Sequence, residues 1–367
     1  MDPAGKPPMG RERRSGPDAT GVVVLAGCAA WSLVSAAGRD GRPEGVLLAV
    51  FAVTAGYACG RLCGSVLPAG AFAAAALGAL ALAVASRDGV PGSVAGTGTP
   101  PGHAGAGAAL LVLAAGAACC AASATRSGSA RPAARLLALA VTCAALVLGS
   151  LPAFVACLAV LLWSLATVRT QRRTAFLAAP ALATGLVAGA SWAVAEDALP
   201  ARLAASVEAP LTPNRVALWR DAVTLAAEDP LRGAGPARFG RLSPTSAGSA
   251  DSDGKPHSAL LQQASEQGAV GVALLGAAFA WILHGMWRSP RPASVVLSAA
   301  GALTALAALA CVGNALSFAP VTAGAGLLAG LATAGTGAGR NDAWPGKAPS
   351  RRGPGKGRDR LGDRRGA

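Results

Sequence analysis

Long runs of apolar residues, separated by short polar connections, dominate the chain. Each run is about 16 to 23 residues long, which is near the length that a helix needs to cross a bilayer. The pattern predicts an all-α integral membrane protein with about ten transmembrane helices. These spans are expected at residues 20–38, 45–62, 66–85, 104–124, 134–149, 152–168, 174–195, 258–287, 293–312 and 316–336.

The connection Gly149-Ser150-Leu151-Pro152 between two of the runs is very short. Proline lacks a backbone N–H and ends or kinks a helix. The runs 134–149 and 152–168 are therefore either two helices joined by a tight turn or one kinked helix. We assign two helices, and one fewer would invert the topology of every later span.

The distribution of charge agrees with this count. Lys and Arg accumulate in cytoplasmic segments, and ten spans with the N-terminus inside place 22 of the 32 basic residues on that side. The long loop at 196–256 holds eight acidic residues against seven basic ones. We expect both termini in the cytoplasm and the long loop at the outer face.

The formal net charge of +14 would suggest a nucleic-acid partner in a soluble protein, but hydrophobic residues make up 53% of this chain. The positive charge lies mainly in the tails and the predicted inner loops, where orientation in a membrane accounts for it. No nucleic-acid partner is expected. The tail at 337–367, rich in Arg, Lys, Gly and Pro, is expected to be disordered and to lie on anionic headgroups.

Seven of the eight cysteines fall within predicted spans and Cys63 directly follows one, as expected of small apolar packing residues. Their spacing predicts neither a disulfide framework nor a metal site, and no cofactor is expected. The segment Val24-Leu25-Ala26-Gly27-Cys28 resembles a bacterial lipoprotein cleavage box. Because the apolar run continues past Cys28, we expect an uncleaved first helix.

The chain therefore divides into five parts. A basic segment at 1–19 precedes a seven-helix membrane region at 20–195, and the external loop covers 196–257. A three-helix membrane region at 258–336 and the basic tail at 337–367 follow. Residues 233–256 of the loop are rich in Gly, Ser, Pro and Asp, which is typical of a mobile lid.

The external loop contains one predicted helix. Thr212-Pro213 is typical of an N-cap followed by proline in the first turn, and the helix should continue to about Asp229, before Pro230. Apolar residues recur on one side and polar residues on the other: Val216, Trp219, Val223 and Ala226 against Arg220, Asp221, Thr224 and Glu228. We expect an amphipathic helix that lies along the membrane surface.

Arg215 falls in the first turn of this helix, where the macrodipole disfavours a cation and favours an anion. A diphosphate bound to the free backbone N–H groups and to the guanidinium would account for the placement. The alternative is an arginine that extends to lipid headgroups. Arg220 is a weaker candidate for substrate binding, because on the polar side it could pair with Asp221 or water.

His257 lies where the long loop re-enters a hydrophobic span. An imidazole exchanges a proton near neutral pH, so it could act as a base at the mouth of a membrane cavity. The alternative is a histidine that only caps the next helix. Gln262 and Glu266 share a helix face farther along, and ionisable groups inside spans are costly, so both are candidates for substrate binding or for a contact between helices.

The spacing of these residues resembles the O-antigen ligase and polymerase family of polytopic bacterial membrane proteins. Three motifs carry the resemblance: Asn214-Arg215-x-x-x-Trp219, Pro230-Leu231-x-Gly233-x-Gly235-x-x-x-Phe239, and His257-x-x-x-Leu261-Gln262-x-x-x-Glu266-x-Gly268-x-x-Gly271. Their order, the membrane context and the intervening loop agree with the family over about residues 135–285.

The resemblance implies a metal-independent glycosyltransferase of the bacterial cytoplasmic membrane. Such proteins transfer or extend glycans carried on undecaprenyl diphosphate at the outer face, with a glycan, a lipid or a protein as the acceptor. Arg215 would then bind the lipid diphosphate, and His257 would be the base that activates the acceptor hydroxyl. Attack at the anomeric carbon would displace the carrier with inversion.

The chain departs from the family pattern at two places. The family usually has Asn directly after the histidine, where this chain has Ser258, and it often has Ser-Arg-Gly-Ala where this chain has Ser150-Leu151-Pro152-Ala153. One of Arg39, Arg42 or Arg202 could replace the charge of the missing arginine in space. The absence of the arginine also keeps open a degenerate member that binds or passes lipid-linked glycans without catalysis. A small-solute transporter is a further alternative, disfavoured because the polar residues gather at one face and not at mid-membrane.

Overall fold

The structure is a computed structural model that describes residues 16–86, 103–167, 173–198, 212–248 and 252–335. These residues form helices and no strand. The elements are α1 (Gly16–Ala36), α2 (Glu44–Val66), α3 (Gly70–Ala85), α4 (His103–Ala124), α5 (Ala130–Val147), α6 (Leu151–Thr167), α7 (Arg173–Ala195), α9 (Pro213–Glu228), α10 (Phe239–Leu242), α11 (Pro244–Ala247), α12 (Ala259–Trp287), α13 (Ala293–Val312), η2 (Ala315–Ser317) and α14 (Ala319–Thr333).

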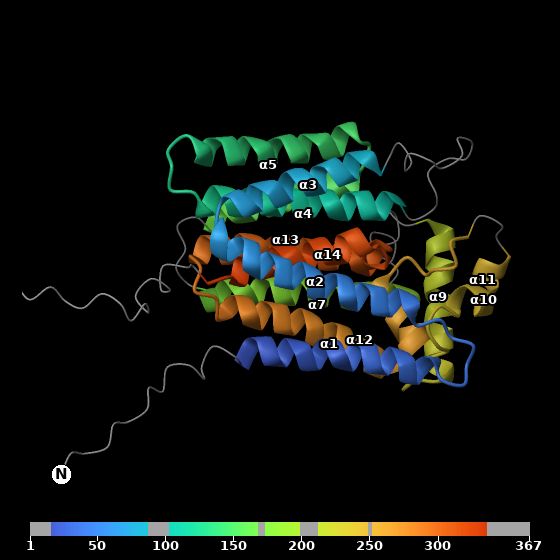
Figure 1. The fold of residues 1–367 in the computed structure, drawn as a ribbon. Helices are drawn as coiled ribbons and strands as arrows, with labels where there is room; N and C mark the ends of the chain where they lie inside the picture. Colours follow the sequence, from blue (N-terminus) through green and yellow to red (C-terminus); the bar gives the residue numbers. More distant parts are fainter. Residues whose placement is uncertain (1–15, 87–102, 168–172, 199–211, 249–251, 336–367) are drawn as a thin grey trace, which may run out of the picture. The chain divides into compact units, whose positions relative to one another are not determined.

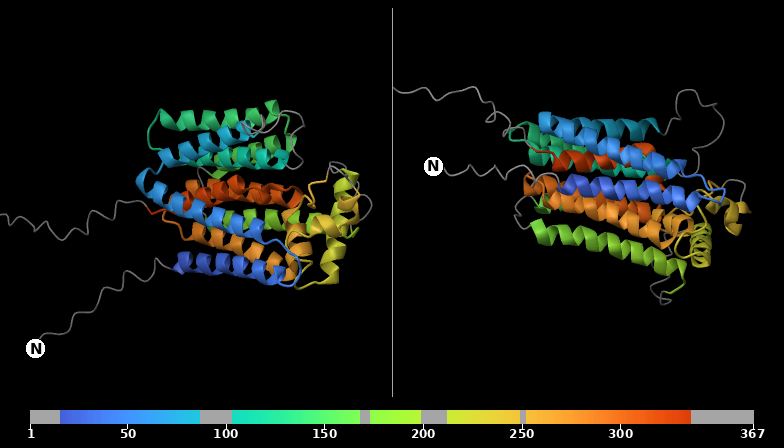
Figure 2. Two further views of the ribbon diagram at one scale, coloured as in Figure 1. Left: turned by 45° about the vertical axis from the view of Figure 1, so that its right-hand side comes forward. Right: turned by 60° about the horizontal axis from the view of Figure 1, so that its bottom comes forward.

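The ten predicted helices all form, and their ends lie within a few residues of the predicted ones. They are α1–α7 and α12–α14, and Figures 1 and 2 show them running side by side along one common direction. The expected tail at 337–367, the first fifteen residues and most of the loop between α3 and α4 lie outside the described residues.

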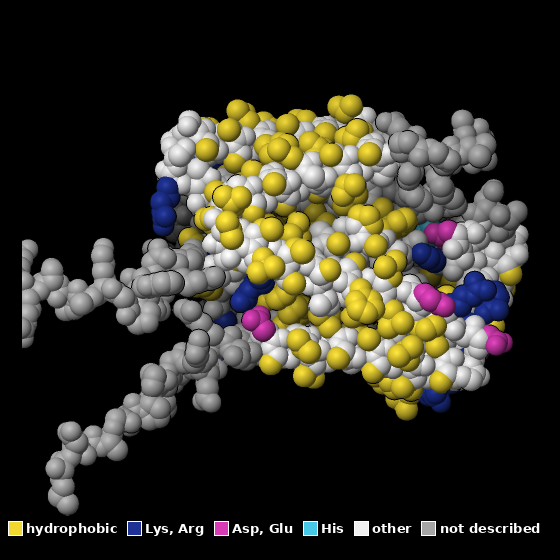
Figure 3. Space-filling view, in the orientation of Figure 1, with side chains coloured by type: hydrophobic (Ala, Val, Ile, Leu, Met, Phe, Trp, Pro, Cys, Tyr) yellow, Lys and Arg dark blue, Asp and Glu magenta, His cyan; other side chains and the backbone are white. Residues whose placement is uncertain are grey.

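Six of these helices, among the described residues, are long and apolar enough to cross a membrane: α1, α2, α4, α5, α12 and α13. Shorter apolar helices are present at Gly70–Ala85, Leu151–Thr167, Ala181–Ala195 and Ala319–Thr333. Figure 3 shows hydrophobic side chains covering the flank of the bundle, with charged groups toward the ends of the helices. An exposed apolar flank of this extent is stable only in lipid, so the chain is a helical membrane protein.

Helix α4 lies at the centre of the bundle. Of the residues in its most apolar stretch, within Gly105–Ala124, 89% are buried. The helix packs against α3, α5, α6, α13 and α14. Its sequence is mostly Ala, Gly, Leu and Cys, and small side chains let neighbouring helices approach closely in a membrane. Cys119 and Cys120 are buried there as free thiols, in keeping with the expected packing role.

The run from 134 to 168 folds as two helices. Helix α5 ends with Gly149 in the left-handed region, at φ +70°. The Ser150 N–H donates to the carbonyl of Ala145 at 3.0 Å, which is the pattern of a glycine-terminated helix end. Helix α6 then packs back against α5, so the interpretation of one kinked helix is wrong.

Helices α2 and α14 meet along a seam of glycines. Gly56, Gly60 and Gly64 recur every fourth residue on α2, opposite Gly326 and Gly330 on α14. A Cβ atom on Gly60 would lie 2.3 Å from the carbonyl oxygen of Leu327, and one on Gly330 would lie 2.2 Å from that of Tyr57. The two backbones are therefore in direct contact, as in other membrane helix pairs with small residues four apart.

Helix α9 runs across one end of the bundle, crosswise to the long helices (Figures 1 and 2). It begins after Thr212, with Pro213 in its first turn, and ends before Asp229, as predicted. Val216 and Trp219 are buried against the bundle, whereas Val223 and Ala226 are only partly buried. Arg220, Thr224 and Glu228 are exposed, so the predicted amphipathic character is confirmed.

The glycine seam gives a stability prediction with opposite signs at two positions. Gly60→Ala should destabilise the protein by about 1–3 kcal/mol, because the added methyl overlaps the α14 backbone. Gly78→Ala on α3 meets nothing within 4 Å, so it should be neutral or stabilising by up to about 1 kcal/mol through helix propensity. Thermal unfolding in detergent measures both; an equal effect of the two substitutions would contradict the seam.

Candidate functional site

Helix α12 is broken near its start. Gly268 has φ +67° and ψ −164°, which is far from helical, so two helical segments meet at this residue. Such a break removes the usual partners of the preceding carbonyl groups and of the following N–H groups. Polar backbone groups buried at this depth must find other partners.

The loop that follows α9 supplies these partners. Ala234 N–H donates to the carbonyl of Ser265 at 2.7 Å, and Gly235 N–H donates to the carbonyl of Glu266 at 2.9 Å. In the other direction, the N–H of Ala269 donates to the carbonyl of Pro230 at 2.8 Å. The indole of Trp31 on α1 donates to the carbonyl of Gln267 at 3.0 Å.

Two glycines make this docking possible. A Cβ atom on Gly233 would lie 2.5 Å from the carbonyl carbon of Glu266, and one on Gly268 would lie 2.4 Å from that of Leu231. Both residues also have positive φ, which glycine adopts without strain. The spacing of the second and third sequence motifs thus has a physical cause: they form one backbone junction between residues 230–235 and α12.

Glu266 fixes the next part of the loop to the same junction. Its side chain is buried and hydrogen-bonds with the backbone of Ala237 and Phe239. Gln262, one turn earlier, donates from Nε2 to Glu266 Oε2 at 3.4 Å. The structure thus brings Gln262 and Glu266 together as predicted, and places both against the protein's own loop.

His257 lies immediately before α12 and has positive φ, +53°. Ser258 is the N-cap of α12, and its hydroxyl accepts a hydrogen bond from the N–H of Leu261. His257 Nε2 lies 3.3 Å from Asp253 Oδ1, and the imidazole is 21% exposed. The serine therefore caps the helix, which leaves the histidine side chain available for other contacts.

Asp253 anchors the histidine to the bundle. Its second oxygen, Oδ2, accepts a hydrogen bond from Asn314 Nδ2 at 3.2 Å, and Oδ1 accepts one from the N–H of Lys255. Asn314 follows α13 and is itself held by the hydroxyl of Ser317 at 2.5 Å. The Asp253–His257 pair is thus fixed by the connection between α13 and α14.

Arg215 lies in the first turn of α9 and is partly buried. Burial lowers the pKa of its guanidinium, and within the described ranges it has neither a hydrogen bond nor an ion pair. Partly buried arginines are normally paired, because desolvating an unpaired charge is costly. The placement therefore favours an anion that no residue of the described ranges supplies.

The charge of Arg215 affects the pKa of His257. Burial lowers the pKa of His257 below its ordinary value of 6.5, the charge of Asp253 acts in the opposite direction, and the charges of Arg215 and Lys255 lower it further. The lowered pKa favours the neutral imidazole, which is the form that can accept a proton. The two residues expected to be central share one electrostatic environment.

The other charged candidates lie elsewhere. Arg220 is exposed and forms an ion pair with Asp197 at 3.5 Å, while Asp221 accepts hydrogen bonds from Ser243 and Thr245 in the loop. Arg39 forms an ion pair with Asp229 at 2.6 Å, so its charge is already used. Arg202 lies outside the described residues.

The turn that lacks the family arginine lies on a different part of the bundle. Ser150 precedes α6, which packs against α13, α4 and α5. Helix α9, by contrast, packs against α12, α11 and α7. Across the part of the chain that the structure describes, no group of three or more His, Cys, Asp or Glu residues could hold a metal ion.

A family model matches part of the chain. It is the model of the O-antigen ligase, and it matches residues 136–276, from within α5 to within α12. The match supports the O-antigen ligase family for this segment. The matched segment contains α9, the loop that follows it, His257 and the break at Gly268. A search of the curated proteins gives no match.

Several residues of this candidate site were missed by sequence reasoning. Asp253 gave one weak signal, since it lies four residues before His257. Asn314 gave none, because it comes 57 residues after His257 and outside the three motifs. Trp31 lies on the first helix and likewise joins the site only through the packing of α1 on α12.

The junction predicts a strong position effect within α12. Gly268→Ala should destabilise the protein by about 1–3 kcal/mol, because the methyl would overlap the Leu231 carbonyl group and φ is positive. Gly276→Ala, on the same helix with nothing within 4 Å, is the matched control and should be neutral or stabilising. Limited proteolysis of the 230–239 loop reports undocking; equal cleavage in both variants would rule the junction out.

Proposed function

We propose that the protein is a membrane glycosyltransferase that moves a glycan from an undecaprenyl-diphosphate carrier to an acceptor hydroxyl at the outer face of the bacterial cytoplasmic membrane. The observation that carries this proposal is that Arg215, a partly buried cation without an ion pair among the described residues, lies close enough to His257 for its charge to lower the pKa of the imidazole. One group suits a diphosphate, and the other suits proton transfer. The family of residues 136–276 supports the same class of substrate.

The proposal includes a ten-span topology. The helices α1–α7 and α12–α14 alternate in direction along the chain. The start of α1 and the end of α14 therefore both lie on the side of the bundle opposite α9 (Figure 1). Arg61, Arg131, Arg135, Arg288 and Arg291 lie on the same side as these chain ends. The positive-inside rule makes that side cytoplasmic and places α9 with the 196–257 loop outside.

Arg215 has the role of binding the donor diphosphate. Two parallel N–H donors of a guanidinium match two phosphate oxygens, and free N–H groups at the start of α9 add to the attraction. Negative charge grows on the diphosphate as the sugar leaves, so this interaction strengthens toward the transition state. Arg220, exposed at the same surface, is proposed to contact the donor or the acceptor less directly.

His257 has the role of the base. It takes the proton of the acceptor hydroxyl as that oxygen bonds to the anomeric carbon, while the bond from this carbon to the diphosphate oxygen breaks. The carrier leaves as the diphosphate with its electron pair, and the configuration at the anomeric carbon is inverted. Asp253 stabilises the imidazolium that forms, and the proton then passes to water.

Gln262 and Glu266 are proposed to act through the loop. Glu266 holds the backbone of residues 237–239, and Gln262 holds Glu266. Their contribution to substrate binding is therefore to position the 230–239 loop between α9 and His257. A substrate contact would have to replace hydrogen bonds that these side chains already make.

A non-catalytic member that binds lipid-linked glycans is the second candidate. Leu151 stands where the family often has an arginine, and Arg39, which could have supplied a charge, is paired with Asp229. Such a protein would keep Arg215 for diphosphate binding and would have no use for a proton acceptor. A measurement of turnover distinguishes the two functions, because only the transferase would release the lipid diphosphate.

The decisive experiment uses the purified full chain with labelled lipid-linked glycan and acceptor. Arg215→Ala and His257→Ala should each lower turnover by about 100-fold or more, as is typical of charge stabilisation and base catalysis. Glu228→Gln, at the exposed end of α9, is the control and should keep full turnover. Equal turnover in all variants would refute the mechanism, and binding without turnover in the wild type would favour the second candidate.

The pH dependence gives an independent check. Because burial depresses the pKa of His257 below 6.5, the base is lost only at lower pH, so the acid limb of kcat/KM should have its midpoint below pH 6.5. Asp253→Asn removes the charge that raises this pKa, so the midpoint should move farther down while kcat falls. A midpoint that rises in Asp253→Asn would contradict the assignment.

A further inference from the structure

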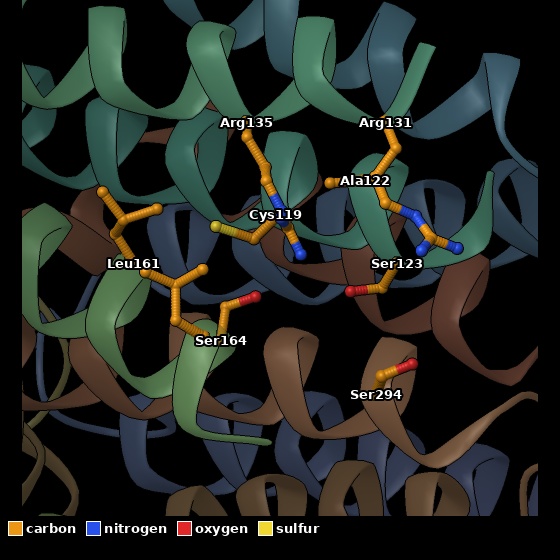
Figure 4. A pocket seen from close by; sticks show the side chains of 9 residues that line it. Cys119, Ala122, Ser123, Arg131, Arg135, Leu161, Ser164 and Ser294 are labelled. Carbon is orange, nitrogen blue, oxygen red and sulfur yellow. The ribbon is translucent and has the colours of Figure 1, made fainter. Parts of the chain in front are cut away.

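A cavity lies at the end of the bundle opposite α9. Its volume is about 170 Å³, and it is enclosed by the end of α4, the start of α5, the end of α6 and the start of α13. Figure 4 shows Arg135 extending from α5 toward Cys119 and Ser164, and Arg131 extending toward Ser123. None of these residues belongs to the site around His257.

The two arginines make the cavity cationic. Arg131 and Arg135 are four residues apart on α5, so they lie on one face and repel each other. They also lie at the start of the helix, where the macrodipole disfavours cations. Among the described residues, no carboxylate lines the cavity and no ion pair involves either arginine.

The walls of the cavity suit a phosphate group. Ser123, Ser164 and Ser294 place hydroxyl groups around it, and hydroxyls together with guanidinium groups are common phosphate ligands. Arg131 Nη2 donates to the carbonyl of Thr125 at 3.2 Å, which fixes the guanidinium at the cavity edge. The cavity is thus lined by guanidinium groups and by hydroxyl groups, both of which can bind a phosphate.

Two of the helices that line the cavity carry exposed apolar side chains. Leu165 lines the cavity and is 46% exposed. Leu136 and Leu139 on α5 and Leu162 on α6 are 65%, 48% and 57% exposed, so the outer surface of these two helices is apolar. A ligand that fits both parts has a phosphate headgroup and hydrocarbon chains that remain in the bilayer.

We propose that this cavity binds the headgroup of an anionic diacyl phospholipid from the leaflet at this end of the bundle. The phosphate lies between Arg131 and Arg135, and the acyl chains lie along α5 and α6. The lipid neutralises the repulsion between the two arginines and thereby holds α5 and α6 on the central helices. This inference does not depend on the proposed transferase activity.

The experiment uses the purified full chain in detergent and native mass spectrometry, with equal amounts of phosphatidylglycerol and phosphatidylcholine. The wild type should retain phosphatidylglycerol with about 30-fold preference, the effect of two arginines near a membrane surface. Arg131→Gln combined with Arg135→Gln should reduce the preference to about threefold or less. Arg288→Gln is the matched control, because it removes an exposed charge that is outside the cavity but on the same side.

Each further outcome decides the proposal. An unchanged preference in the double variant, or an equal loss in Arg288→Gln, overturns it and leaves only general surface charge. Displacement of phosphatidylglycerol by millimolar inorganic phosphate also overturns it, since the site would then take a free anion. Thermal unfolding in phosphatidylcholine checks that the double variant folds; if it does not, Arg135→Gln alone should lower the preference about fivefold, and no change would refute the site.

Discussion

The structure at the α9 end of the bundle depends on one constraint: the backbone groups released where α12 breaks at Gly268 must be hydrogen-bonded inside the protein. Three carbonyls, those of Ser265, Glu266 and Gln267, and the N–H of Ala269 receive partners from residues 230–235 and from Trp31. In a membrane protein each unpaired group would cost several kcal/mol. The segment 230–235 is therefore as firmly determined as a helix, although it has no regular secondary structure.

This junction is also what positions the chemistry. By holding residues 230–239 against α12, it sets where α9 lies across the bundle and brings Arg215 within the electrostatic range of His257. A second anchor, from Asn314 through Asp253, fixes the imidazole from the other side. The guanidinium and the imidazole thus belong to two segments that are each tied to the membrane helices, which is how a rigid site can be built largely from loops.

Arginines at the two ends of the bundle differ in how their charges are balanced. At the α9 end, Arg39 forms an ion pair with Asp229 and Arg220 forms one with Asp197, whereas Arg215 has no ion pair among the described residues. At the opposite end Arg131 and Arg135 face a cavity without a carboxylate among the described residues. In both places a cation near the start of a helix has its charge balanced by no group of the described chain, and both places favour a phosphate-bearing lipid.

The sequence by itself determined the helices, because runs of apolar residues of bilayer length have few other stable structures, and it determined α9, because proline, capping residue and amphipathic spacing agree. It also indicated Arg215, His257, Gln262 and Glu266. Only the tertiary structure decided that Glu266 holds the protein's own loop, that Asp253 and Asn314 orient the imidazole, and that Gly233 and Gly268 are needed for contact between backbones. These features depend on distances between segments far apart in the chain, and local patterns of polarity carry no information about such distances.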